Sequence, residues 1–139
     1  MLNQAKGKSI DRIIDANINR AKEGLRVCED ITRFILDNRE FSLKLKKIRH
    51  RVSELSLYLA PRARLFEGRN SIKDVGRFIK ADELKRKGVR DIFFANMQRV
   101  KESIRVLEEF AKLGNLKAAL GFKDIRYKIY DIEKKVLGE

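Results

Sequence analysis

The chain has 139 residues, a formal net charge of +13, a pI of about 10.1, one cysteine and one histidine. A single cysteine cannot form an intramolecular disulfide, and one cysteine with one histidine cannot complete a zinc site. No apolar run approaches the roughly 18 residues of a membrane span, and residues 1–8 are polar. We therefore expect a protein of the reducing cytoplasm, without a signal peptide.

This length accommodates one domain with one core and is too short for a (β/α) barrel. Helix-forming residues dominate, with one proline and no tryptophan, so the composition predicts an all-α fold. The positive charge favours polyanionic partners, namely nucleic acid, acidic lipid or a phosphorylated small molecule. Charge alone does not choose among them.

The first half of the chain predicts two helices. One runs from about residue 10 to residue 37, with Ser9 as its N-cap, and closes at Asn38. The second covers residues 41–59, where leucine, isoleucine and valine recur at helical spacing, and Pro61 ends it.

Residues 60–90 interrupt the helical pattern and are predicted to form a connector. This segment is rich in arginine and lysine and includes Arg69, Asp74 and Gly76. Glycines let a backbone approach a ligand, and arginines can hold phosphate oxygens. An exposed basic connector is the simpler interpretation of the same residues.

The second half predicts three further helices. Asp82 is expected to cap a short helix that Gly88 ends. A long helix follows over residues 91–113, and a left-handed stop is predicted at Gly114. The last helix begins at residue 116 or 122 and ends near residue 137, since apolar residues continue at helical spacing to that point.

The sequence contains an internal repeat. Between Ile13 and Glu29, an offset of 79 residues gives nine identities in seventeen positions, and residues 48–55 resemble residues 125–132 at an offset of 77. The repeats cover about residues 10–59 and 91–137. We therefore predict a single domain over residues 1–139. It is a bundle of four main helices built from a duplicated hairpin with pseudo-twofold symmetry, with short helices in the connector.

In each copy, polar residues recur at every third position. On an α-helix each such step covers about 300°, so successive residues of the row are displaced by about 60° around the helix axis. Asn17 thus lies within the apolar arc, Arg20 lies at its edge, and the second copy repeats both placements. A buried amide or guanidinium needs partners. Two interpretations stay open: ladders of ion pairs with capping asparagines, or two facing copies that line a polar pocket. The rows are Asn17, Arg20, Glu23, Arg26 and Glu29, repeated as Asn96, Arg99, Glu102, Arg105 and Glu108.

The sequence has no phosphate-binding loop, no dinucleotide-binding glycine turn and no sign of a catalytic triad. Asparagines, arginines and carboxylates on helices remain, and they can bind a phosphorylated ligand or a nucleotide with magnesium. His50 is more typical of a packing or hydrogen-bonding residue than of a catalytic base, although its neighbour Arg49 recurs as Arg126. We expect Cys28 to be a core residue.

Several motifs carry a resemblance to a known family: the segments Asp15 to Asp30 and Ala95 to Glu109, the triplet at residues 48–50, and Arg69 with residues 74–76. Over nearly its whole length the chain is similar to the helical domain at the N-terminus of some bacterial thiamine phosphate synthases, which also occurs as a separate protein. The resemblance implies a hydroxymethylpyrimidine phosphate kinase of thiamine biosynthesis, with ATP and magnesium as cofactors and a phosphorylated aminopyrimidine as substrate. One departure is conservative: the family tends towards Glu-Ala-Leu-Arg where this chain has Glu-Ser-Ile-Arg at residues 102–105.

The resemblance supplies no mechanism, so the roles that it implies are hypotheses. The amides of Asn17 and Asn96 would contact the aminopyrimidine edge. The carboxylates of Glu23, Glu102 and Asp74 would act as catalytic base or magnesium ligands. The residues expected at the substrate and its phosphates are Asn17, Arg20, Arg26, Arg49, His50, Arg69, Gly76, Asn96, Arg99, Arg105 and Arg126.

Two other functions compete with the kinase. A basic nucleic-acid-binding module would gather its cations on one convex face, but few aromatic residues are available for base stacking, so this alternative is less favoured. A non-catalytic helical partner that docks to thiamine phosphate synthase would instead show an exposed apolar patch. Thiamine phosphate synthase is the expected functional partner, and a homodimer stays open.

Overall fold

The computed structural model describes residues 2, 7–78 and 85–138, and every regular element within these ranges is helical. The predicted all-α class is therefore confirmed. No helix in this part of the chain combines the length and apolarity needed to cross a bilayer. The elements are α1 (Gly7–Asp30), the π-helical turn η2 (Ile31–Ile35), α2 (Arg39–Ser56), α3 (Arg62–Gly68), α4 (Val89–Ala111) and α5 (Leu116–Gly138).

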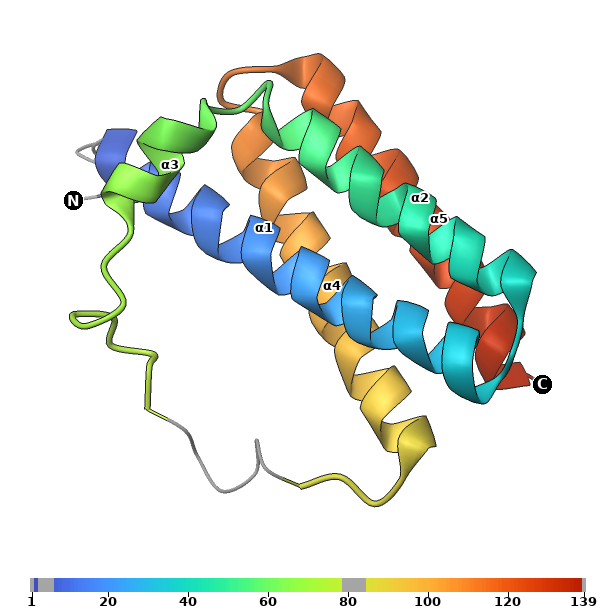
Figure 1. Ribbon diagram of the computed structural model, residues 1–139. Coiled ribbons are helices and arrows are strands. Elements are labelled where there is room, and N and C mark those ends of the chain that lie inside the picture. The colour runs from blue at the N-terminus through green and yellow to red at the C-terminus, as the bar shows by residue number, and fades with distance from the viewer. Residues whose placement is uncertain (1, 3–6, 79–84, 139) are drawn as a thin grey trace.

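The four long helices form two antiparallel hairpins, α1 with α2 and α4 with α5 (Figure 1). The hairpins associate through α1 against α4 and through α2 along α5, while the short α3 packs on α1. This is the predicted bundle of four main helices. The single-domain assignment and the pseudo-twofold symmetry stay predictions.

Apolar residues at helical spacing explain why these segments fold around one core. In α1, Ile14, Ala21, Leu25 and Cys28 lie on one face and are at most 4% exposed. Burying each large aliphatic side chain contributes roughly 1.5–3 kcal/mol of hydrophobic stabilisation. The facing side chains of α4 are Phe93, Met97, Val100, Ile104 and Leu107.

α1 and α4 approach closely at Gly24. A Cβ atom there would lie 2.7 Å from Val100 Cγ2 and 3.0 Å from the backbone oxygen of Asn96. Only glycine lets the two backbones come so near each other without displacing α4. The contact also places the first-copy helix directly beside the second-copy residue Asn96.

The ends of the first hairpin's helices differ from the prediction. α1 begins at Gly7, so Ser9 lies inside the helix and does not cap it. After η2, Asp37 has a φ of 50°, a left-handed conformation that few residues other than glycine adopt. The Asn38 side chain then accepts a hydrogen bond from Phe41 N at 2.9 Å. Asn38 therefore begins α2 as its N-cap, whereas the prediction placed it at the end of the first helix.

The connector also differs from the prediction. Pro61 is the N-cap of α3, a short helix of the kind predicted for the connector, although the prediction placed none directly after Pro61. Gly88 is the N-cap of α4 instead of a helix stop, and residues 85–87 are not helical. The predicted cap at Asp82 lies outside the described residues.

The turn between α4 and α5 is built by a side-chain cap. Asn115 Oδ1 accepts a hydrogen bond from Ala118 N at 2.9 Å and begins α5. None of the glycines in the described ranges has a positive φ, so the left-handed stop predicted at Gly114 is wrong.

Candidate functional site

Each hairpin is fastened by a buried ion pair between its two long helices. Arg49 of α2 donates from Nε and Nη2 to the Glu29 carboxylate of α1, at 2.8 and 3.3 Å. Arg126 of α5 makes the same paired contact with Glu108 of α4, at 2.9 and 3.4 Å. The hydrogen bonds to Glu108 raise the pKa of Arg126 above its ordinary value. These two arginines therefore serve to join helices.

Two buried aspartates of α1 tie the α3 region to it in a similar way. Arg64 Nε lies 2.9 Å from Asp11 Oδ2. Arg69 Nη2 and Nε donate to the two carboxylate oxygens of Asp15, at 2.7 and 2.8 Å. The hydrogen bonds to Asp15 raise the pKa of Arg69. A phosphate would have to displace a carboxylate before Arg69 became free to bind it.

One surface hollow brings together several of the predicted site residues. Asn17, Arg20, Arg69 and Asp74 line a hollow of about 620 Å³ between α1 and the connector, which we call the α1–connector hollow. Gly76 adjoins it, because the Gly76 N–H donates to Asp74 Oδ1 at 2.9 Å. Guanidinium, amide and carboxylate groups converge here, so this hollow is the candidate site for a polar small molecule.

The two matched asparagines satisfy their amides within their own helices. Asn17 Nδ2 donates to the backbone oxygen of Ile13 at 2.8 Å, and Asn96 Nδ2 donates to that of Ile92 at 2.8 Å. Asn17 is 4% exposed, and its Oδ1 accepts a long contact from Arg20 Nη1 at 3.5 Å. The bond back to the preceding turn explains how an amide is tolerated on the apolar face.

The other predicted residues lie on separate surfaces. Arg26 and Arg49 line a hollow at the α1–α2 turn, whereas Glu102, Arg105 and Arg126 line one between α4 and α5. No hollow described in this structure brings the matched asparagine, arginine and glutamate residues of the two copies together, so none is the shared pocket that the facing copies predicted. The roles assigned to these side chains stay predictions. Glu23, His50 and Arg99 are exposed and line none of these hollows.

The proposed magnesium ligands do not form one group. Asp74 lines the α1–connector hollow, Glu102 lines the α4–α5 hollow, and Glu23 points from an exposed position of α1. The described residues contain no cluster of three or more histidine, cysteine, aspartate or glutamate side chains that can hold a metal ion. These carboxylates therefore do not fit a shared magnesium ion, and ATP stays an untested expectation.

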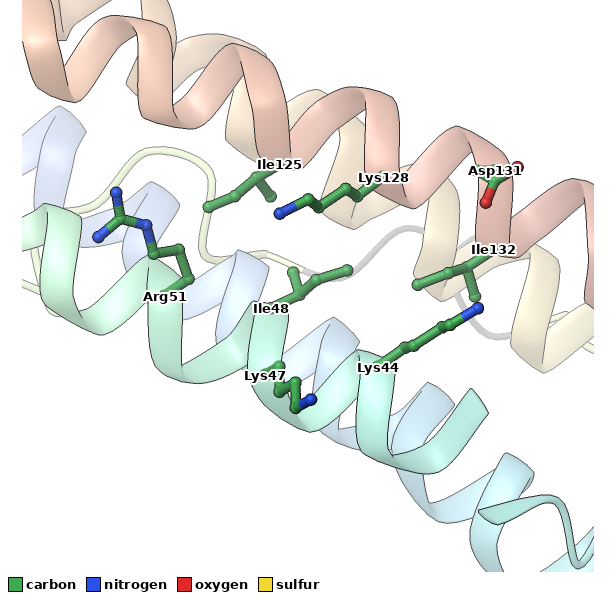
Figure 2. Close-up of a pocket in the computed structure, with 8 residues that line it drawn as sticks. All are labelled: Lys44, Lys47, Ile48, Arg51, Ile125, Lys128, Asp131 and Ile132. Carbon is green, nitrogen blue, oxygen red and sulfur yellow. The ribbon is translucent and has the colours of Figure 1, made fainter. Parts of the chain in front are cut away.

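A further hollow of about 410 Å³ lies between α2 and α5 (Figure 2), and we call it the α2–α5 groove. Ile48 of α2 and Ile125 and Ile132 of α5 point into it from facing helices. No residue that the sequence nominated for the site lines this groove. Its basic residues are Lys44, Lys47, Arg51 and Lys128.

Together these features define a class of protein: a two-hairpin helical bundle held by carboxylate–arginine pairs, with polar hollows on its surface. Residues 12–135 match the ThiD2 family, and the chain belongs to that family. It is 40% identical over 99% of its length to a thiamine-phosphate synthase of Synechocystis sp., covering 39% of that protein. Proteins of the same name from Nostoc punctiforme and Prochlorococcus marinus are 37% and 36% identical over 91% and 96% of the chain, which covers 35% and 37% of them. No solved structure shows significant similarity to the chain.

These comparisons correct the predicted activity. The relatives are named thiamine-phosphate synthase, which contradicts the prediction that the chain is a hydroxymethylpyrimidine phosphate kinase. The geometry agrees with this correction in one respect. Arg49, Arg69 and Arg126, three of the expected phosphate-binding residues, are engaged by buried carboxylates. The chain spans less than two fifths of the length of these relatives.

The sequence analysis missed the acidic partners of these arginines. These partners are all less than 9% exposed, and each carboxylate accepts hydrogen bonds from an arginine of another helix or, for Asp15, from Arg69, which caps the end of α3. They are Asp11, Asp15, Glu29 and Glu108. A signal existed for two of them. Glu29 and Glu108 are identical in the repeat, and so are Arg49 and Arg126, although the offsets of 79 and 77 differ.

Proposed function

We propose that this chain is a non-catalytic helical module of thiamine biosynthesis that docks to thiamine-phosphate synthase. The arrangement of the relatives carries the proposal. In each of them, the region similar to this chain belongs to a polypeptide of which it covers less than two fifths. A region tethered within one polypeptide meets the remainder at high effective concentration, so even a weak docking surface is occupied.

An apolar surface at one end of the bundle supports docking. The end of α2 and the α4–α5 turn lie at this end (Figure 1), and a Cβ added at Gly121 of α5 would lie 2.8 Å from the Leu55 side chain of α2. We call the surface the apolar end. It consists of Leu57, Tyr58, Leu113, Leu116 and Leu120, each between 62% and 69% exposed.

Five large apolar side chains so exposed at one end are unusual for a surface with no partner. Covering them gains roughly 25 cal/mol per Å² of apolar area removed from water. Exposed apolar side chains gathered in one region commonly mark protein interfaces. The non-catalytic partner interpretation predicts such a patch, and the buried carboxylate partners of the arginines weaken the case for a catalytic pocket.

A chimera tests the proposal. In the Synechocystis relative, the matching region is replaced by this chain, and thiamine phosphate formation is compared among the natural protein, the chimera and a version that lacks the region. We expect the chimera to regain rate or thermal stability that the shortened version loses. A shortened version that equals the natural protein in both rate and stability refutes the proposed function.

Paired substitutions locate the docking surface within the chimera. Leu116→Asp combined with Leu120→Asp places two charges on the apolar end and should remove the regained rate or stability. Phe94→Asp is the matched control, because Phe94 is 52% exposed on α4, outside the apolar end. Equal loss in both variants, or loss in neither, overturns the assignment of this surface.

A further inference from the structure

The connection between α1 and α2 borders the hollow already noted at this turn, of which the sequence analysis nominated only Arg26 and Arg49. It has a volume of about 620 Å³ and lies between the last turn of α1, η2 and the first turns of α2. Figure 1 shows this connection at the end of the first hairpin beside the C-terminal end of α5. We call it the turn hollow. Its cationic lining residues are Arg26, Arg33, Arg39, Lys46 and Arg49.

Three of these cations have no acidic partner. Among the described residues, Arg33, Arg39 and Lys46 form no ion pair, and the only contact recorded for Arg33 is its guanidinium over the Phe34 ring at 4.7 Å. All three side chains are exposed, so they can turn towards a ligand without breaking a bond. Unpaired cations around one concave surface repel each other, and an anion relieves that repulsion.

The remaining two cations share a single carboxylate. Arg49 forms its bonds with Glu29, and Arg26 Nη1 lies 3.7 Å from the same carboxylate. Asp37 is the only other acidic residue that lines the hollow. Five cations against two carboxylates leave an excess of three positive charges. The excess matches an anion of about three charges, as a diphosphate group carries near neutral pH.

The turn that frames the hollow is held in place by hydrogen bonds. Asn38 N donates to the backbone oxygen of Thr32 at 2.8 Å, and the Asn38 side chain caps Phe41 N. Thr32 is fully buried, so this bond anchors the turn to the core. The cationic side chains therefore project from a backbone that is held in place, which lowers the entropic cost of gathering them around a ligand.

The related turn of the second copy keeps most of these cations but pairs them differently. At the offsets of 79 and 77 residues, the counterparts of Arg26, Arg33, Lys46 and Arg49 are Arg105, Lys112, Lys123 and Arg126, whereas Arg39 corresponds to Leu116. Arg105 and Lys112 lie 3.1 and 2.9 Å from the Glu109 carboxylate, whereas Arg33 forms no ion pair among the described residues. The turn of the first hairpin therefore differs from its counterpart in having Arg39 and in leaving Arg33 unpaired.

We propose that the turn hollow binds a diphosphate group, either as inorganic pyrophosphate or as the diphosphate of an organic ester. Arg33, Arg39 and Lys46 supply the contacts that are free in the structure, and Arg26 adds a fourth through its half-exposed guanidinium. Arginine forks and lysine ammonium groups both form charge-assisted hydrogen bonds with phosphate oxygens. The site does not rest on docking to a synthase, since it belongs to this chain alone.

Binding of inorganic pyrophosphate to the purified chain, measured by titration calorimetry at constant ionic strength, tests the site. Lys46→Gln and Lys47→Gln form a matched pair, because both residues are exposed on α2 and both changes remove one charge. Lys47 lines the α2–α5 groove instead of the turn hollow (Figure 2). We expect Lys46→Gln to weaken binding roughly two- to fivefold and Lys47→Gln to leave it unchanged. Adding Arg39→Gln to Lys46→Gln should give a loss of roughly tenfold.

Every outcome decides the proposal. Equal weakening by Lys46→Gln and Lys47→Gln reveals attraction to the net charge only and overturns the site, as does binding that neither change affects. Inorganic phosphate should bind more weakly than pyrophosphate, and equal affinities overturn the assignment to a diphosphate. Methyl diphosphate then separates the two sources: retained affinity identifies an ester, and loss identifies the free anion. Circular dichroism confirms that each variant is folded.

Discussion

The buried pair of Glu108 and Arg126 gives the sharpest test of what holds the second hairpin together. The pair joins α4 to α5 through two hydrogen bonds, and its side chains are 5% and 14% exposed. We consider three variants: Glu108→Gln, Arg126→Met and the double substitution. Glutamine keeps the shape of glutamate without its charge, and methionine replaces the arginine stem with an apolar side chain of similar length.

The structure sets the size of the effect. Removing one partner of a buried ion pair costs roughly 3–5 kcal/mol, because the other charge is left buried. Arg105 Nη1 lies 3.4 Å from the same carboxylate and can partly replace Arg126, although its side chain is 52% exposed. We therefore expect Arg126→Met to cost about 2–3 kcal/mol and Glu108→Gln about 1–2 kcal/mol. The double variant should cost less than their sum, with a coupling energy of about 2 kcal/mol.

Urea unfolding followed by circular dichroism measures all four proteins, and equal m-values justify comparing their free energies of unfolding. The exposed pair of Glu40 and Lys44 on α2, at 2.8 Å, is the control. Water and salt screen that pair, so its coupling should be clearly smaller. A coupling between Glu108 and Arg126 no larger than the control would show that the buried pair does not join the helices as argued.

Three further predictions concern stability and use the same unfolding measurement. Gly24→Ala should lower the free energy of unfolding by about 1–2 kcal/mol despite its gain in helix propensity, because the new methyl group meets the α4 backbone. Gly121→Ala should lower it by less, because its methyl group meets only the side chain of Leu55. Equal losses in the two variants would contradict this reasoning. Asn38→Ala should cost about 1 kcal/mol through the lost cap of α2, and no loss would show that the cap is dispensable. Burial raises the pKa of Cys28 from 9.0 to about 12, so its contribution to stability is complete below pH 9 and is lost as the pH rises towards 12. Between pH 8 and pH 10 the natural protein should lose about 1 kcal/mol more than Cys28→Ala, and parallel losses would refute the shift.

The bundle could be predicted because apolar periodicity alone determines which face of each long helix is buried. Ile14, Ala21 and Leu25 recur at helical spacing and all lie in the core. The helix ends were less predictable, since they depend on which polar side chain caps which backbone group. Asn38 and Asn115 both follow a helix in sequence, yet each caps the helix that comes after it.

The site was harder to predict than the fold, because its contacts join residues that no spacing rule relates. The helical wheel placed Asn17 within the apolar face and Arg20 at its edge; Asn17 is buried, Arg20 is exposed, and both line the α1–connector hollow. The wheel cannot show that Asp15 binds Arg69, 54 residues further along the chain. Such pairs depend on how helices pack, which the sequence of one helix does not specify.

The two hairpin turns show how related segments can serve different purposes. At matching positions, Arg39 borders the turn hollow and Leu116 belongs to the apolar end. The 18 residues of α2 separate the two ends by about 27 Å along its axis. A partner whose contacts are confined to the apolar end therefore leaves the turn hollow open to solvent. Docking and anion binding can then occur at the same time, so a variant that loses one while keeping the other is the natural consequence of this arrangement.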